Sequence, residues 1–184
     1  TRRSEQRKIS SSGVEWFLDN YPYAVDAIEL IEEDLPEDFF RKLPGLPGSG
    51  NPRIFEIARK MVEHFQVDLV QGNLNQTLTA YQRYENLRMS ELWAFPLMLR
   101  LVLVQILTQT VTQLISERPE KLFSAHNLAL KDIQVAALDT DEVIARVLRT
   151  LILFDQTDWK KFFERHASVE KILQQDPARV YAKM

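Results

Sequence analysis

The chain has 184 residues, a formal net charge of −3 and no cysteine. Its length supports one hydrophobic core, so a single domain is expected. The slight acidity argues against nucleic-acid binding, which requires a basic face. The absence of cysteine excludes disulfides and thiolate metal sites, and it fits a reducing compartment. Only five glycines are present, and the abundance of helix-forming residues favours an all-helical fold.

Residues 1–10 are basic and polar, and we expect them to form a solvated tail before a helical domain at 11–184. A contact of this tail with a membrane surface or a partner is the alternative. The tail lacks the apolar stretch of a signal peptide. Because the chain begins with Thr1, we expect it to be a fragment of a larger multidomain protein.

A capping box at Ser12–Glu15 predicts the first helix. Two apolar strips follow the box, and they predict that this helix is covered on two sides. The strips are Val14, Phe17, Leu18, Tyr21, Val25 and Ile28, and Trp16, Tyr23, Ala27 and Leu30. Pro22 is expected to kink the helix, or to split it with Asn20 as a second cap. Asp34 and Glu37 then predict the capped start of a short helix.

The segment from Leu43 to Pro52 is rich in glycine and proline and reads as a loop. It lacks the Gly-Lys-Ser/Thr ending of a phosphate-binding loop. Asn51 is expected to cap the next helix, with Pro52 in its first turn. Gly72 is expected to end the segment that contains this helix, and a further helix is predicted at 73–86.

The longest apolar run predicts a central buried helix at about 90–116, capped by Ser90 and kinked at Pro96. Nearly every position from Leu97 to Val104 is apolar, which indicates burial on most sides. We expect a core helix and no membrane span, because Arg100 and several later glutamines interrupt the run. Arg100 needs a partner, and four acidic residues are candidates: Glu15, Asp19, Asp34 and Glu91. A ligand-facing arginine is the alternative.

Within residues 120–139, the run Lys131–Asp139 reads either as a helix or as one short strand. Asp139 and Glu142 then predict a capped helix with a strong apolar stripe. Asp155 or Thr157 is expected to cap another helix, which carries Trp159, Phe162 and Phe163. Further short helices are predicted between Val169 and Tyr181.

No catalytic, cofactor or metal site is predicted. Asp139 and Asp141 form an Asp-x-Asp pair, but a metal-dependent transferase presents such a pair from a parallel sheet, which this sequence does not predict. The three histidines lack zinc-ligand spacing and read as helix-surface residues. The aromatic residues Trp16, Tyr81, Trp93 and Trp159 all fall on expected core stripes. The candidates for a structural or docking role are Arg100, Trp93, Glu91, Trp16, Asp19, Tyr81 and Trp159.

Several runs, taken in order, resemble the N-terminal region of cyclic β-1,2-glucan synthases, which are very large bacterial membrane enzymes. The runs are Glu15–Asn20, Glu33–Pro36 with Phe39, Arg41–Pro44, Pro52-Arg53, Ala80–Gln82, Ser90–Pro96 with Leu99-Arg100, Asp158-Trp159 with Phe162–Glu164, and Asp176–Ala178 with Val180–Ala182 and Met184. The resemblance implies a parent enzyme that makes glucan rings from UDP-glucose. It also implies a segment on the cytoplasmic side of the bacterial inner membrane that lacks the parent's catalytic regions.

We therefore predict an all-α, single-domain bundle of seven to nine helices around the central helix. The leading hypothesis is a non-catalytic accessory or scaffold domain of a membrane-bound cyclic β-1,2-glucan synthase, with other domains of the parent chain as partners. One alternative is a module that binds glucan or a sugar nucleotide, and another is a stand-alone helical protein-interaction domain. Whether the chain is itself an enzyme stays open, because only the parent is a glycosyltransferase by resemblance.

Overall fold

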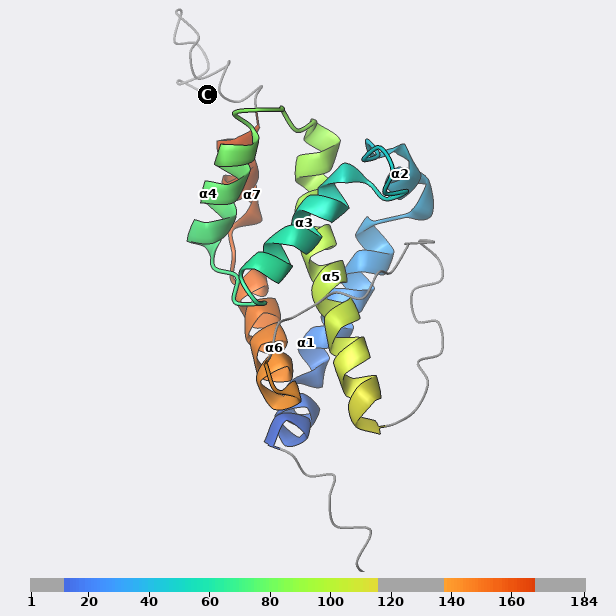
Figure 1. The fold of residues 1–184 in the computed structure, drawn as a ribbon, viewed down its shortest axis with the longest axis vertical. Helices are drawn as coiled ribbons and strands as arrows, with labels where there is room; N and C mark the ends of the chain where they lie inside the picture. The colour runs from blue at the N-terminus through green and yellow to red at the C-terminus, as the bar shows by residue number, and fades with distance from the viewer. Residues whose placement is uncertain (1–11, 116–137, 168–184) are drawn as a thin grey trace, which may run out of the picture.

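The computed structural model describes residues 12–115 and 138–167, and this part of the chain is all-α (Figure 1). Its seven helices are α1 (Ser12–Asp34), α2 (Glu37–Lys42), α3 (Arg53–His64), α4 (Gln71–Tyr81), α5 (Met89–Ile115), α6 (Thr140–Asp155) and α7 (Trp159–His166). The expected fold class is confirmed. Residues 1–11, 116–137 and 168–184 are outside the described part, and so are the predictions made for them.

Helix α5 is the centre of the bundle. It packs against α1, α3 and α6, while α1 also lies along α6. Figure 1 shows α3 crossing α5 at an angle, with α4 and α7 side by side at one end of the bundle. Every residue from Leu97 to Leu107 is buried, as the sequence predicted for a core helix. By length and composition α5 could also cross a membrane, but most of its apolar stretch is buried inside the bundle.

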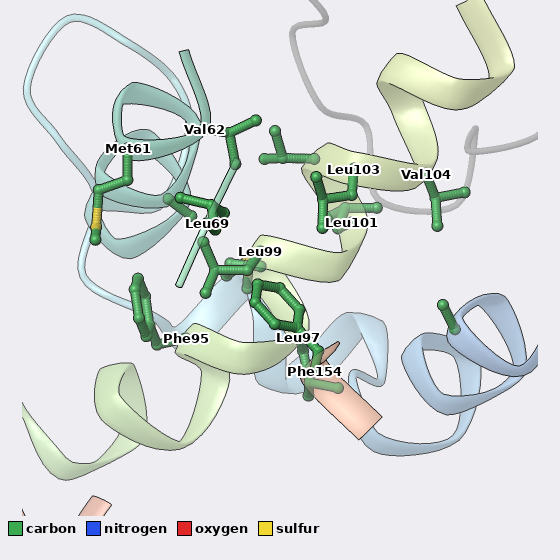
Figure 2. Close-up of a cluster of buried hydrophobic side chains, with 14 of the residues drawn as sticks. Met61, Val62, Leu69, Phe95, Leu97, Leu99, Leu101, Leu103, Val104 and Phe154 are labelled. Carbon is green, nitrogen blue, oxygen red and sulfur yellow. The ribbon is translucent and has the colours of Figure 1, made fainter. Parts of the chain in front are cut away.

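All seven helices contribute side chains to the core, and Figure 2 shows the part of it where α3, α5 and α6 meet. Met61 and Val62 of α3 face the middle of α5, and Phe154 of α6 reaches it from another helix. Phe95 of α5 is fully buried in this cluster. Burying a large apolar side chain contributes about 1.5–3 kcal/mol, so each of these side chains adds appreciably to the stability of the fold.

Some predicted helix boundaries are confirmed and others are wrong. Asp139 caps α6, because its side chain accepts a hydrogen bond of 2.8 Å from the Glu142 amide. The cap of α7 is Asp158 and not Asp155 or Thr157, since α6 continues through Asp155. The α7 cap has the same chemistry, because Asp158 accepts from the Lys161 amide at 3.0 Å.

Pro22 and Pro96 lie inside α1 and α5 as predicted, whereas the split of α1 and the caps predicted beside Pro36 and Pro52 are wrong. Helix α1 continues through Pro22 without a second cap, and the Asn20 side chain instead donates to the Trp16 carbonyl at 2.9 Å. Pro36 and Pro52 are themselves the N-cap residues of α2 and α3, in place of Asp34 and Asn51. A proline fits there because its fixed φ suits a helix start and its missing N–H is not needed.

The turn after α3 is made without glycine. Gly72, which was expected to end this segment, lies in the first turn of α4. The chain turns instead at Gln66 and Val67, whose φ angles are +50° and +68°. Such angles are rare for residues other than glycine. Helix α6 holds the turn, because the Thr150 hydroxyl donates to the Val67 carbonyl at 2.7 Å.

Candidate functional site

A groove lies between the end of α1, the start of α2, the first half of α5 and α7. Its volume is about 670 Å³. It is lined by Leu30, Asp34, Pro36, Phe39, Leu92, Trp93, Pro96, Leu97, Arg100, Trp159, Lys160, Phe162 and Phe163. Small-molecule sites are usually pockets of about 300–1,000 Å³ with mainly apolar and aromatic walls. We call this hollow the Trp93 groove.

Helix periodicity places these side chains together. On α5, Trp93, Pro96, Leu97 and Arg100 are spaced by three or four residues, so they share one face. On α7, Trp159, Phe162 and Phe163 follow the same spacing. Each helix therefore contributes one stripe, and the contact between α5 and α7 joins the stripes into one surface.

Arg100 is a buried cation within the groove wall. Its side chain is 5% exposed, and Nη2 lies 3.3 Å from Oδ1 of Asp155. Its guanidinium carbon is 5.7 Å from the ring centres of both Phe154 and Trp159, within cation–π range. Burial lowers the pKa of Arg100, and the hydrogen bond to Asp155 opposes that shift. The geometry gives Arg100 a structural role rather than a free, ligand-facing one.

The expected partners of Arg100 were wrong. The structure pairs it with Asp155 and with none of Glu15, Asp19, Asp34 or Glu91. Asp34 does line the same groove as Arg100. The last turn of α6 packs beside α5 and carries the carboxylate that reaches the guanidinium.

Trp93 is not a core residue, contrary to the prediction. It is 66% exposed, and its ring centre lies 5.0 Å from that of Phe163. Trp159 is half-buried, and its indole N–H donates to the Phe154 carbonyl at 2.9 Å. Trp16 and Tyr81 are half-buried against the core and lie outside the groove. The groove thus joins two of the four aromatic candidates, Trp93 and Trp159, with Arg100.

Glu91 belongs to a separate, buried ion pair. It is completely buried, and its carboxylate accepts from Arg53 Nε at 2.9 Å and Arg53 Nη2 at 2.6 Å. It also accepts from the Arg88 amide at 2.9 Å, which satisfies one free N–H at the start of α5. Glu85 pairs with the same guanidinium. The pKa of Arg53 is raised, chiefly by the hydrogen bond from its guanidinium to Glu91.

The Arg53–Glu91 pair is a structural clamp that sequence reasoning missed. It joins the first turn of α3 to the first turn of α5. The available signal was a charged Arg53 directly before the apolar stripe of α3. Tyr81, another candidate, lies beside this clamp, and its hydroxyl is 3.5 Å from Glu85 Oε2. Tyr81 also lines a second groove, of about 430 Å³, together with residues of α3.

One apolar stripe of α1 is exposed. Leu18, Tyr21 and Val25 are 61%, 51% and 39% exposed, and their spacing of three and four residues places them on one stripe. The expected covering of α1 on two sides is therefore wrong for this stripe. Other residues of the predicted strips do pack against the core, namely Phe17 and Ile28 of the first and Trp16, Ala27 and Leu30 of the second. Ala24 and Ile31 are buried beside them. Asp19, the remaining candidate, is exposed next to Leu18.

Within residues 12–115 and 138–167, no three His, Cys, Asp or Glu side chains converge in a way that could hold a metal ion. Asp139 acts as the cap of α6, as expected for the Asp-x-Asp pair. His64 is exposed and packs edge-on against Phe65. His166 is buried, so its predicted position on a helix surface is wrong, and its Nε2 lies 2.9 Å from Asn75 Oδ1.

No family model matches the chain. Over 93 residues, which is 50% of its length, the chain is 36% identical to the cyclic β-(1,2)-glucan synthase NdvB of Rhizobium meliloti (strain 1021). The chain therefore resembles a cyclic β-(1,2)-glucan synthase. The match covers 3% of the length of that enzyme. The chain thus corresponds to a small part of its relative.

Most of the Trp93 groove is built from the runs that resemble cyclic β-1,2-glucan synthases in the sequence analysis above. The lining residues within those runs are Asp34, Pro36, Phe39, Leu92, Trp93, Pro96, Arg100, Trp159, Phe162 and Phe163. They come from four helices and the turn between α1 and α2. Runs that are far apart in sequence therefore meet at one place on the surface.

Proposed function

We propose that this chain is a non-catalytic helical accessory domain of a membrane-bound cyclic β-1,2-glucan synthase. In this proposal it lies N-terminal to the catalytic regions, on the cytoplasmic side of the bacterial inner membrane. The observation that carries the proposal is the 36% identity to a cyclic β-(1,2)-glucan synthase, over a region that is 3% of that enzyme. A segment of that size fits an accessory role within a much larger chain.

The surface of the domain supports a docking role. A monomeric protein rarely leaves a regular apolar stripe uncovered, and such patches mark interaction sites. The stripe of Leu18, Tyr21 and Val25 has helical spacing, which suits packing against another helix. We propose that this stripe packs against another part of the same synthase.

Deletion in the parent enzyme tests the accessory role. The full-length synthase and a version without this segment are compared in membranes for β-1,2-glucan synthesis. The expected result is reduced synthesis after deletion, with recovery when the 184-residue chain is added separately. Full synthesis after deletion, together with no binding between the chain and the remainder, would refute the proposal.

A matched pair of variants tests the stripe. Tyr21→Lys places a charge in the proposed interface, whereas Tyr84→Lys changes a tyrosine that is 92% exposed on the loop before α5. Tyr21→Lys is expected to weaken binding to the remainder of the synthase by at least about tenfold, because a lysine is buried unpaired. Tyr84→Lys is expected to bind normally. Equal binding by both variants would exclude the stripe as the docking surface.

A further inference from the structure

An exposed indole beside an aromatic groove is the starting observation. Trp93 is 66% exposed at the edge of a hollow of about 670 Å³, whose walls include Trp159, Phe162 and Phe163. The face of an aromatic ring carries partial negative charge. It therefore attracts the slightly positive C–H groups that line the flat faces of a β-glucose ring. The groove offers such a surface over a volume in the range of ligand pockets.

The charges of the groove favour an uncharged ligand. Its ionisable side chains are Asp34, Lys160 and Arg100, and Arg100 is already paired with Asp155. One carboxylate and one ammonium group remain, so the site has no excess positive charge for a pyrophosphate. The N-terminus of α7 is also occupied, because its own cap Asp158 accepts the free N–H of Lys161. A sugar nucleotide therefore has no anion site here.

The polar rim favours a polyhydroxyl chain over an apolar helix. Asp34 and Lys160 are exposed. An apolar helix lying in the groove would remove both charges from water without hydrogen bonds, which costs several kcal/mol per isolated charge. Sugar hydroxyls can donate to the carboxylate of Asp34 and accept from the ammonium of Lys160. A glucan thus satisfies both the aromatic wall and the charged rim.

From these observations, and resting on the proposed function, we infer that the Trp93 groove binds a neutral β-1,2-glucan chain. Glucose rings stack on Trp93, and Asp34 and Lys160 hydrogen-bond to their hydroxyls. Arg100 stabilises the position of Trp159 through its cation–π contact and does not contact the sugar. The groove thereby retains the polymer near the synthase rather than taking part in glucosyl transfer.

Calorimetric titration of the 184-residue chain with linear β-1,2-glucan tests the inference, with UDP-glucose titrated in parallel. Glucan is expected to bind with a Kd of about 1 mM or tighter, and UDP-glucose is not expected to bind. Trp93→Ala is expected to weaken glucan binding by about tenfold or more, by analogy with the loss of an aromatic side chain that stacks on a nucleic-acid base. Trp93→Phe keeps an aromatic face and is expected to retain most of the affinity.

Tyr84→Ala is the matched control, because Tyr84 is the most exposed aromatic residue named here and lies outside the groove. Circular dichroism of each variant verifies folding. Absence of glucan binding, or equal glucan affinity in the unsubstituted chain and in Trp93→Ala, would overturn the inference. Loss of binding to the remainder of the synthase in Trp93→Ala, without glucan binding, would make the groove a protein-docking site. That result would leave the proposed accessory role intact. If the chain binds glucan but deleting it leaves glucan synthesis by the synthase unchanged, only the accessory role is refuted.

Discussion

The buried pair of Arg53 and Glu91 makes the sharpest stability prediction. Glu91→Ala removes a carboxylate that is completely buried and accepts three hydrogen bonds, two from Arg53 and one from the Arg88 amide. The guanidinium then stays in a side chain that is 9% exposed, with Glu85 and the Asn86 carbonyl as its remaining partners.

Breaking a buried ion pair by removing one partner costs about 3–5 kcal/mol. The remaining contacts of Arg53 place the expected loss at the lower end, about 3 kcal/mol. The free energy of unfolding of a domain is about 5–15 kcal/mol, so the variant loses a large share of its stability. Urea denaturation followed by circular dichroism measures this loss as a lower midpoint at unchanged slope.

A double variant separates the cost of an unpaired charge from the value of the pair. Arg53→Met with Glu91→Leu replaces both charges with apolar side chains, and it is expected to be more stable than Glu91→Ala alone. Arg41→Met, which breaks the exposed pair of Arg41 and Glu37, is the control and is expected to change stability by less than about 1 kcal/mol. A loss below about 1 kcal/mol for Glu91→Ala would refute the reasoning.

Three further predictions follow from single contacts. Arg100→Met is expected to cost less than about 1 kcal/mol in urea denaturation, because its partner Asp155 is 45% exposed and stays hydrated. Thr150→Val is expected to cost about 0.5–1.5 kcal/mol, because the Val67 carbonyl in the left-handed turn loses one of its two donors and keeps the Leu69 amide at 3.0 Å; an unchanged urea midpoint would contradict this. Hydrogen bonds from Lys161 lower the pKa of Asp158 below its ordinary 3.8, so the stability from this cap is present above about pH 4 and is lost as the pH falls through the folded-state value. Asp158→Asn keeps a capping side chain without the charge. Its thermal unfolding midpoint is expected to fall less between pH 5 and pH 2 than that of the unsubstituted chain.

Within the described residues, the sequence by itself determined which segments are helical and which helix is central, although not every helix boundary. The apolar run from Leu97 to Val104 has no polar face to leave in water, so only a buried position suits it. The cap at Asp139 was also determined locally, because its hydrogen bond spans only three residues. The spacing of apolar residues and the chemistry of a helix cap depend only on residues that are close in sequence. They can therefore be recognised without a structure.

Only the tertiary structure decided the charge partners and the exposed surfaces. Arg100 and Asp155 are 55 residues apart, and Arg53 and Glu91 are 38 apart, so each pair depends on which helices pack together. The exposure of Trp93 likewise depends on tertiary packing, because Phe163 of α7 contacts its ring but leaves it 66% exposed. An apolar stripe indicates that a helix face is suited to burial, but the number of helices available to cover it is a property of the whole fold.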